Sequence, residues 1–166
     1  MATHSSVSLR PGEECLEEPL WLEENARLCF IGRVRTPWGP EDCPGNIAAA
    51  RATGQGARIE LADGMERGLV GLSVGQPMVA VYWMDHARRD LIVQAPRHCD
   101  GPRGTFALRS PHRPNPIALS VVTIRAIDAA AGVLEIDALD CFDGTPLLDL
   151  KPWLPTVDAP HREQTE

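Results

Sequence analysis

The sequence predicts a mainly β protein that folds as a single antiparallel β-barrel with short helices and long loops. Six or seven short apolar runs with β character are separated by turn residues, and helical periodicity is nearly absent over the 166 residues. The alternating β and α units and the glycine-rich first turn of a Rossmann-type sheet are also missing. An antiparallel sheet closed into a barrel accounts for these features together.

Composition divides the chain into an N-terminal extension, a barrel domain and a short C-terminal tail. Residues 1–26 are rich in serine, proline and glutamate, so we expect an extension there. Residues 27–160 form the expected barrel domain, and residues 161–166 form the tail. With 43% hydrophobic and 23% charged residues, the chain has the composition of a globular domain that buries a core.

The expected strands are short apolar runs bounded by glycine, proline or charged residues. In chain order they are residues 27–34, 57–61, 78–83, 90–94, 104–108, 117–127 and 133–139. Residues 47–52 predict one short helical turn inside a loop, and residues 63–72 predict a short helix or turn. Residues 128–132, DAAAG, join two apolar runs and therefore predict a hairpin connection.

The charges are unevenly distributed along the chain. A net charge of −7 argues against a protein that binds nucleic acid over its whole surface. Residues 86–116 nevertheless contain six arginines against Asp90 and Asp100, and such a basic strip can contact phosphates locally. The alternative is an arginine-rich face that pairs with acidic residues elsewhere. The six arginines are Arg88, Arg89, Arg97, Arg103, Arg109 and Arg113.

The chain shows neither a membrane span nor a secretory signal, so we expect a cytoplasmic protein that binds no membrane. No apolar run approaches the roughly 20 residues that a transmembrane helix requires. The first residues, MATHSSVSLRPGEE, lack a basic segment followed by an apolar one. Five cysteines without a C-x-x-C pair predict free thiols and no metal site.

Two segments hold the residues best suited to chemistry. Residues 108–120 read LRSPHRPNPIALS, in which three prolines predict a rigid, irregular loop before an apolar run. A rigid loop bearing Arg109, Arg113 and Asn115 presents donors in a fixed geometry that suits an anionic ligand. Residues 140–152 read DCFDGTPLLDLKP and place several carboxylates close to a lysine. Paired surface loops are the alternative interpretation of these segments.

Together the two segments resemble the TsaA/TrmO family of S-adenosylmethionine-dependent tRNA methyltransferases. The family pattern runs roughly F-A-x-R-S-P-x-R-P-N-P-I-x-L-S and then D-x-x-D-G-T-P-x-x-D-I-K-P-Y; this chain follows both, with Trp153 in place of the final tyrosine. Further matches are Ile31-Gly32, Thr36-Pro37 and residues 82–86. The likeness covers about residues 27–158, and it implies a short form that lacks the C-terminal domain of many longer relatives.

The resemblance implies that S-adenosylmethionine binds on a single β-barrel, near a homodimer interface. A pocket for this cofactor needs a donor for its carboxylate, an acceptor for its ammonium or ribose, and an apolar surface for its adenine. The candidates for these three roles are Arg109, Asp140 and Leu119. Family position adds Met84, Asp85 and His86, and also the loop Pro44, Gly45 and Asn46, where many relatives have Pro-Arg-Gln.

The implied reaction is methylation of N6 on the threonylcarbamoyl-adenosine at position 37 of tRNA, in the anticodon loop. Because methyl transfer from a sulfonium is an in-line displacement, the protein mainly positions the reactants, while the target nitrogen loses a proton. Asn115, Asp143 or Asp149 could accept this proton. Lys151 could orient a carboxylate or meet a tRNA phosphate.

Several alternatives stay open at this point. His86 and His112 are alternative bases. Trp83 and Trp153 either stack on unpaired bases of the anticodon loop or belong to the core. Two other functions compete with the implied one: a non-catalytic protein that binds S-adenosylmethionine or RNA, and a methyltransferase with another acceptor.

Overall fold

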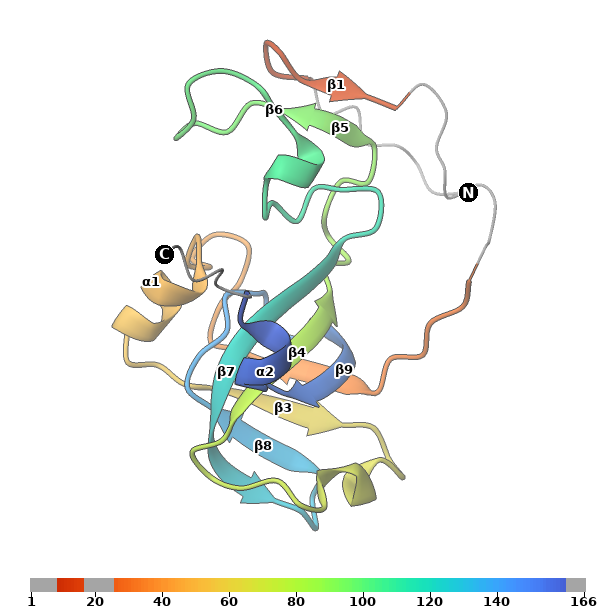
Figure 1. The fold of residues 1–166 in the computed structure, drawn as a ribbon, viewed down its shortest axis with the longest axis vertical. Coiled ribbons are helices and arrows are strands. Elements are labelled where there is room, and N and C mark those ends of the chain that lie inside the picture. Colours follow the sequence, from red (N-terminus) through yellow and green to blue (C-terminus); the bar gives the residue numbers. More distant parts are fainter. Residues whose placement is uncertain (1–8, 17–25, 161–166) are drawn as a thin grey trace, which may run out of the picture. The chain divides into compact units, whose positions relative to one another are not determined.

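A closed barrel of antiparallel strands dominates the structure, which is a computed structural model describing residues 9–16 and 26–160. Six strands form the barrel in the order β2-β3-β8-β7-β4-β9, and Figure 1 shows their arrangement. The predicted mainly β, barrel-type fold is therefore confirmed. The six strands are β2 (Gly32–Arg35), β3 (Ala57–Leu61), β4 (Pro77–Trp83), β7 (Ile117–Asp128), β8 (Val133–Ile136) and β9 (Pro146–Pro152).

The core lies inside this barrel because alternate residues of each strand point inward. In β4, for example, Met78, Ala80 and Tyr82 are each at most 3% exposed. Aliphatic side chains from the other strands complete the cluster, and the β-branched valines and isoleucines among them favour strands. The fully enclosed members include Val34, Ile59, Val122, Ile124, Leu134, Ile136 and Leu147.

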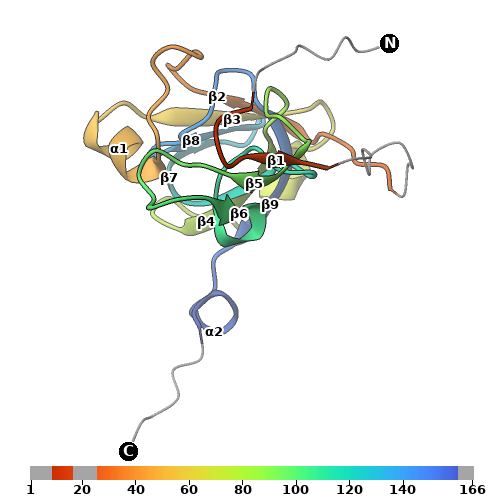
Figure 2. The ribbon, with the colours of Figure 1, turned by 90° about the horizontal axis from the view of Figure 1, so that it is seen from above.

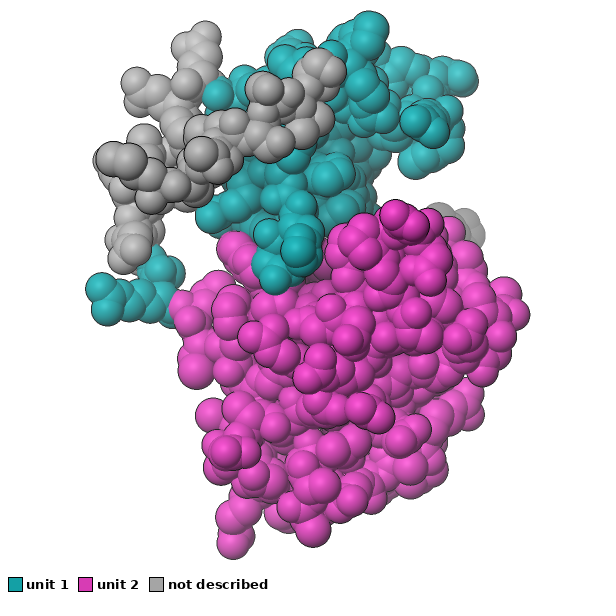
Figure 3. Space-filling model, turned by 180° about the vertical axis from the view of Figure 1, so that it is seen from behind, with its two compact units in different colours: residues 1–27, 85–116 teal, residues 28–84, 117–166 magenta. Residues whose placement is uncertain are grey.

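The chain divides into two compact units, which Figure 3 shows in different colours. The barrel unit consists of residues 28–84 and 117–166, and the insert unit consists of residues 1–27 and 85–116. The insert unit contains a sheet of three strands in the order β1-β5-β6, followed by a short 3-10 helix. Its elements are β1 (Glu14–Cys15), β5 (Leu91–Gln94), β6 (Arg103–Gly104) and η3 (Thr105–Ala107).

Part of the expected N-terminal extension takes part in the fold. β1 pairs with β5, and the backbone N–H of Leu16 donates to the carbonyl of Asp90 at 2.8 Å. Glu13 is buried beside this strand and accepts hydrogen bonds from Arg10. Residues 9–16 therefore belong to the insert unit, while the rest of the expected extension up to residue 25 lies outside the described residues, as does the expected tail over 161–166.

Most expected elements are found, one expected strand is absent, and some observed elements lie outside the predicted ranges. β3 and α1 (Ile47–Ala52) have the predicted bounds, and the 3-10 helix η2 (Glu66–Leu69) falls inside the predicted turn. The strand predicted over 104–108 is wrong, because β6 ends at Gly104 and η3 follows it. β9 was not predicted, because prolines at both ends and two charged residues interrupt its apolar pattern.

One glycine allows the first two barrel strands to approach each other. A Cβ atom added to Gly32 would lie 2.2 Å from the carbonyl oxygen of Glu60 and 2.9 Å from the Cα of Leu61. Any side chain here would separate β2 from β3, which are paired from Gly32 to Arg35. Gly32 is therefore required by packing and not by backbone conformation.

The helices are short and lie outside the barrel. Asn46 caps α1, since its Oδ1 accepts the backbone N–H of Ala49 at 2.9 Å. Figure 2 shows α2 (Pro155–Asp158) standing away from the barrel strands. No helix in the described part of the chain has the length and apolar character needed to cross a membrane.

We expect substitution of Leu147 to Ala to destabilise the protein strongly. Leu147 is fully enclosed and lies on β9, the strand that closes the barrel, so its truncation leaves a cavity in the core. The free energy of unfolding should fall by about 2–5 kcal/mol in urea titrations. Leu154, which is 46% exposed, serves as the matched control, and Leu154→Ala should change stability far less. Equal effects of the two substitutions would contradict this account of the core.

Candidate functional site

The first part of the second motif lies on a loop that is held by Thr36 and Trp38, two residues that follow β2. We call residues 139–145 the DGT loop. The indole Nε1–H of Trp38 donates to the carbonyl of Leu139 at 2.8 Å, and the hydroxyl of Thr36 donates to the carbonyl of Cys141 at 2.8 Å. Trp38 is 6% exposed, so this bond is protected from water. The DGT loop is thus fixed without belonging to a strand.

Asp143, a predicted proton acceptor, takes part in the same network. One of its carboxylate oxygens accepts the backbone N–H of Thr36 at 3.3 Å, and the other lies 3.6 Å from Nη1 of Arg35. Arg33 donates to the carbonyl of Gly144, the next residue, at 2.8 Å. These contacts assign Asp143 a structural part in shaping the turn.

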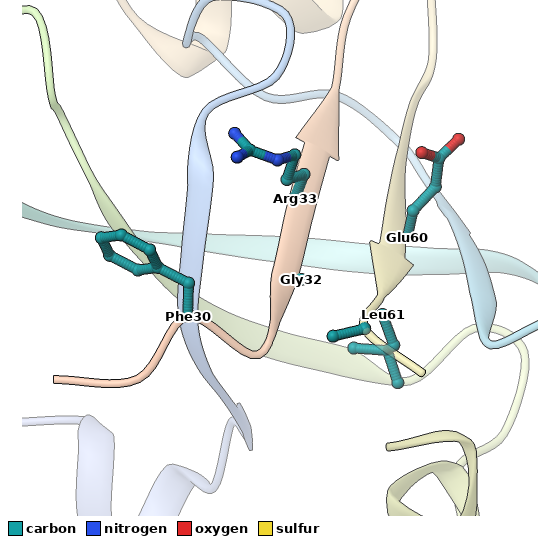
Figure 4. Close-up of a pocket in the computed structure, with 6 residues that line it drawn as sticks. Phe30, Gly32, Arg33, Glu60 and Leu61 are labelled. Carbon is teal, nitrogen blue, oxygen red and sulfur yellow. The ribbon is translucent and has the colours of Figure 1, made fainter. Parts of the chain in front are cut away.

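The outer face of β2 and β3 is charged and contains a hollow. Figure 4 shows Phe30, Gly32, Arg33, Glu60 and Leu61 lining it, with the Arg33 guanidinium pointing away from Glu60. Glu60 instead pairs with Arg35 of β2 at 2.7 Å and with Arg58 of β3 at 2.8 Å. The hydrogen bond from Arg35 is the main reason that the pKa of Glu60 lies below its ordinary value. None of the predicted site residues lines this hollow.

Asp140 and the loop Pro44–Gly45–Asn46, both predicted to bind the cofactor, lie in the same region of the barrel unit. Burial, with a smaller contribution from the negative charge of Asp140, raises the pKa of the Cys43 thiol to about 11. Cys43, which directly precedes Pro44, packs against the small cluster of Trp38, Ala50 and Ala138. Ala138 lies two residues before Asp140, so the two predicted segments share one region.

Helix α1 is tied to the barrel wall by its last turn. Arg51 donates through Nη2 to the carbonyl of Val121 on β7 at 2.7 Å, and its Nε lies 2.7 Å from Oδ2 of Asp137. Asp137 is largely buried, with 9% of its side chain exposed, so the pair is shielded from solvent on one side. The loop that carries Asn46 therefore has a fixed position relative to β7.

A third group of predicted residues lies on the outer wall of the barrel. Leu119 on β7 is opposite Val81 on β4, and Val81 is opposite Asp149 on β9, so three strands present these side chains in one row. Leu119 is 46% exposed. Lys151 lies two residues beyond Asp149 and pairs with its carboxylate at 2.5 Å. The structure thus brings Leu119, Asp149 and Lys151 together.

The remaining predicted residues belong to the insert unit, apart from Met84. Met84 follows β4 at the boundary of the barrel unit and packs against its core. Asp85 and His86 lie next to each other at the start of the insert unit, with 3.9 Å between a carboxylate oxygen of Asp85 and Nε2 of His86. Arg109 and Asn115 are exposed on the proline-rich loop of that unit.

A buried polar network fixes the proline-rich loop. The amide Nε2 of Gln94 donates to the Thr105 hydroxyl at 2.9 Å and to the carbonyl of His112 at 2.6 Å. The Thr105 hydroxyl in turn donates to the carbonyl of Leu91 at 3.0 Å. Gln94 and Thr105 are 3% and 1% exposed, and sequence reasoning missed both, because a lone polar residue near an apolar run carries no distinctive signal.

His112 and Arg88 link this loop to the start of the insert unit. The Nδ1 atom of His112 accepts the backbone N–H of Arg88 at 3.1 Å, so this nitrogen is unprotonated in the structure. Arg88 pairs with Asp90 at 2.7 Å, and this hydrogen bond keeps the pKa of the Asp90 carboxyl well below its usual range. The charge of Arg88, expected to contact phosphate, is therefore already neutralised.

The described residues do not suggest a metal centre. In residues 9–16 and 26–160, no three His, Cys, Asp or Glu side chains gather closely enough to hold a metal ion. All five cysteines are free, and burial raises the pKa of Cys141 to about 12. A thiol with so high a pKa is a poor nucleophile near neutral pH.

The fold and the two motif loops define a class of small closed β-barrel proteins that differ from nucleotide-binding parallel sheets. A family profile described as the tRNA-methyltransferase O N-terminal domain matches residues 34–159. This match covers most of the chain, and the chain belongs to that family.

Individual relatives agree with this assignment. The chain is 34% identical over 152 residues to a probable S-adenosyl-L-methionine-binding protein, VirR, of Rhizobium radiobacter, covering 91% of this chain and 83% of that protein. It is 30% identical over 148 residues to a mouse tRNA (adenine(37)-N6)-methyltransferase, covering 87% of this chain and 32% of that protein. A crystal structure of TrmO from Pseudomonas aeruginosa matches with a TM-score of 0.62 and 26% identity, covering 86% of this chain and 63% of that one.

The chain is shorter than several of the proteins that it resembles. A probable S-adenosyl-L-methionine-binding protein of Archaeoglobus fulgidus is 35% identical over 137 residues, which are 80% of this chain but 35% of that protein. The chain therefore spans about a third of the Archaeoglobus and mouse proteins, and less than two thirds of the Pseudomonas chain.

We expect acid to loosen the insert unit through His112. Burial, with the positive charges of Arg88 and Arg10, lowers the pKa of His112 below its ordinary value. As the pH falls, the unfolded chain binds this proton first, so the stability contributed by neutral His112 is fully present above about pH 6.5 and declines below that value. Thermal melts between about pH 7.5 and pH 5.5 should show this decline.

The variant His112→Asn tests the source of the effect. An asparagine oxygen can accept the Arg88 N–H in place of Nδ1 but does not titrate in this range, so the pH dependence should flatten. The neighbouring carboxyls of Glu13 and Asp90 have lowered pKa values and stay ionised throughout the window. If the melting temperature of His112→Asn depends on pH as strongly as that of the wild type, another group causes the loss of stability in acid. His98→Asn, at an exposed site of the same unit, is the matched control.

Proposed function

We propose that this protein is an S-adenosylmethionine-dependent methyltransferase that modifies N6 of threonylcarbamoyl-adenosine at position 37 of tRNA. Membership of the tRNA-methyltransferase O N-terminal domain family supports this proposal. So does the printed name of the mouse relative, a tRNA (adenine(37)-N6)-methyltransferase. That the modified adenosine carries a threonylcarbamoyl group is proposed because the two motifs resemble those of the TsaA/TrmO family. A tRNA substrate implies a cytoplasmic location.

The observation that carries the proposal is the fixed position of Asp140. Thr36 and Trp38 hold the backbone carbonyls on both sides of Asp140, so the main chain that carries its carboxylate is fixed before any ligand arrives. A preorganised carboxylate binds an ammonium or ribose hydroxyl with less loss of conformational entropy than a mobile one. Cys43, the residue before the loop Pro44–Gly45–Asn46, packs against Ala138, two residues before Asp140, which supports placing both in one site.

The residues of the barrel unit fit the chemistry of S-adenosylmethionine. Asp140 offers an acceptor for the ammonium or ribose, and the exposed Leu119 offers apolar surface for the adenine. Arg109 of the insert unit is the proposed partner of the carboxylate. When bound, S-adenosylmethionine supplies an electrophilic methyl group. Further contacts are proposed, by family position, for Met84, Asp85 and His86.

Among the proposed proton acceptors, the geometry favours Asp149. Asp143 shapes the turn of the DGT loop through Thr36 and Arg35, whereas Asp149 lies in register with the apolar wall next to Val81. The ammonium of Lys151 at 2.5 Å keeps the Asp149 carboxylate oriented. Asn115, on the exposed proline-rich loop, is the proposed partner of the target base, because an amide can both donate and accept.

A second candidate function is binding of S-adenosylmethionine without catalysis. The names of the Rhizobium and Archaeoglobus relatives refer to S-adenosyl-L-methionine binding and not to transfer. Incubation of the protein with cofactor and tRNA that lacks the methyl group, followed by mass spectrometry of the nucleosides, separates the candidates. Methylated threonylcarbamoyl-adenosine supports the proposed enzyme, a methyl group elsewhere identifies another acceptor, and its absence favours the binding protein.

We expect Asp140→Asn to weaken cofactor binding while preserving the fold. The substitution keeps the shape of the side chain but removes the charge that would pair with the ammonium, at a cost of about 1.5–3 kcal/mol in binding free energy. Calorimetric titration with S-adenosylmethionine in the presence of EDTA measures the loss. Asp63→Asn, at an exposed loop position, is the control and should bind as the wild type does. Equal affinities of the wild type and Asp140→Asn would remove Asp140 from the site.

We also propose that the protein forms a homodimer through the outer face of β7. Ile117, Leu119 and Val121 point outward in one row and are 42%, 46% and 38% exposed. This apolar row lies on the part of β7 that pairs with β4, and a second copy can cover it, because burial of apolar surface is the main driving force of such interfaces.

A charge in this row should separate the copies. Val121→Glu would place an unpaired carboxylate in the proposed interface, so we expect sedimentation velocity to show a monomer where the wild type is dimeric. Val70 is 79% exposed and lies outside the row, and Val70→Glu is the matched control. Dimers that persist unchanged in Val121→Glu would exclude this face as the interface.

A further inference from the structure

Phe106 is unusually exposed for an aromatic side chain in this protein. It is 79% exposed, whereas Trp38 and Tyr82 are buried and Phe30 is 46% exposed. Trp83 and Trp153, the two tryptophans considered for base stacking, are partly buried. The structure therefore makes Phe106 the most accessible aromatic surface of the described residues.

The backbone beneath Phe106 is rigid. Phe106 is the central residue of η3, and the preceding residue, Thr105, is 1% exposed. The Thr105 hydroxyl donates to the carbonyl of Leu91 at 3.0 Å and accepts a hydrogen bond from Gln94 at 2.9 Å. The ring is thus presented to solvent from a fixed support, which reduces the entropy lost when a ligand stacks on it.

Positive charge surrounds this support and is not neutralised by the contacts that hold it. Arg113 approaches the carbonyl of Thr105 with Nη2 at 3.5 Å, next to the peptide bond that joins Thr105 to Phe106. Arg103 donates to two backbone carbonyls, those of Asp100 and Pro102, each at 3.0 Å. A carbonyl orients a guanidinium but leaves its full charge available to a phosphate.

The local charge is opposite to that of the whole chain. Residues 97–113 contain four arginines and one aspartate, in a protein whose net charge is −7. Because the field of such a segment is felt within about 10 Å at ordinary salt, nearby anions are attracted although the protein as a whole is acidic.

We infer that Phe106 is a stacking platform for an unpaired RNA base and that Arg103 and Arg113 hold the flanking phosphates. An exposed aromatic ring among arginines is the arrangement by which proteins bind single-stranded nucleic acid, because every base offers a flat face to the ring. A paired A-form helix hides those faces, so the ligand class is a loop or single strand and not a duplex. The inference deepens the proposed function and rests on its tRNA substrate.

The test measures stacking directly. The probe is a synthetic RNA hairpin with an anticodon-type loop that carries 2-aminopurine at the target adenosine, and its fluorescence reports both affinity and stacking. Phe106→Ala should bind this hairpin about 5- to 100-fold more weakly than the wild type, whereas Phe106→Trp should bind it as well or better. Phe30→Ala, at the other exposed phenylalanine, should change nothing.

Two further measurements test the phosphate contacts and show whether Phe106 acts on RNA binding alone. Arg113→Gln should reduce the salt dependence of hairpin binding by about one unit of slope, as expected when one phosphate contact is lost. Calorimetry should show that Phe106→Ala binds S-adenosylmethionine as the wild type does, and its melting temperature should be unchanged because the side chain is exposed.

The outcomes distinguish this inference from the proposed function. If the wild type methylates tRNA and Phe106→Ala binds the hairpin equally well, the platform is overturned and the enzyme assignment stands. If the wild type methylates no tRNA but Phe106 governs hairpin binding, the platform stands and the enzyme assignment is overturned. A wild type that does not bind the hairpin, or a loss shared equally by Phe30→Ala, overturns the platform.

Discussion

The backbone hydrogen bonds of β9 are the interaction on which the barrel depends. β9 pairs with β2 on one side and with β4 on the other, two strands that are distant from it in the sequence, and so converts an open sheet into a closed one. Every barrel strand then has two neighbours, so closure pairs backbone groups that the ends of an open sheet would leave exposed. Bonds from Ile31 to the carbonyl of Leu147, and from Val34 to that of Thr145, extend this seam beyond the ladder. The DGT loop enters β9 directly, so closure of the barrel also sets the position of Asp140.

Both motif loops obtain their rigidity in the same way, although they lie in different units. Each is irregular in backbone and is held by a few buried or partly buried side chains that bond to main-chain groups. These are Trp38 and Thr36 for the DGT loop and Gln94 and Thr105 for the proline-rich loop. Such bonds satisfy carbonyls that would otherwise be buried without a partner. The loops lose their conformational entropy when the protein folds and not when a ligand binds, so their charged side chains are already close to a binding geometry.

The sequence predicts most barrel strands well, because the apolar pattern of a strand can be recognised within a few consecutive residues. β3 and α1 have their predicted bounds, and the hairpin between β7 and β8 forms where DAAAG predicts it. β9 escapes prediction because its strand character comes from two long-range partners, while Pro146, Asp149 and Pro152 argue against a strand. The division into two units is also a long-range property, since residues 9–16 join the insert unit only by pairing with β5.

In the candidate site, too, some residues can be predicted from neighbouring sequence and others depend on partners far along the chain. The motif residues can be found by pattern, but Gln94 and Thr105 cannot, because their role depends on burial and on partners more than ten residues away. Arg88 belongs to the predicted basic strip, yet its charge is taken up by Asp90 two residues on. Charge counting along a sequence does not distinguish such a paired arginine from Arg103, which donates to carbonyls.

The register between β4 and β7 has a consequence for how proteins of this design diversify. The chain leaves the barrel after Trp83 and returns at Ile117, and these two residues are paired neighbours on adjacent antiparallel strands. Residues 85–116 therefore occupy the position of an ordinary hairpin loop, whose length has little effect on the sheet that bears it. Residues 85–116 can change in size and sequence while the barrel keeps its register, so the specificity of this unit is free to evolve without a matching cost in foldability.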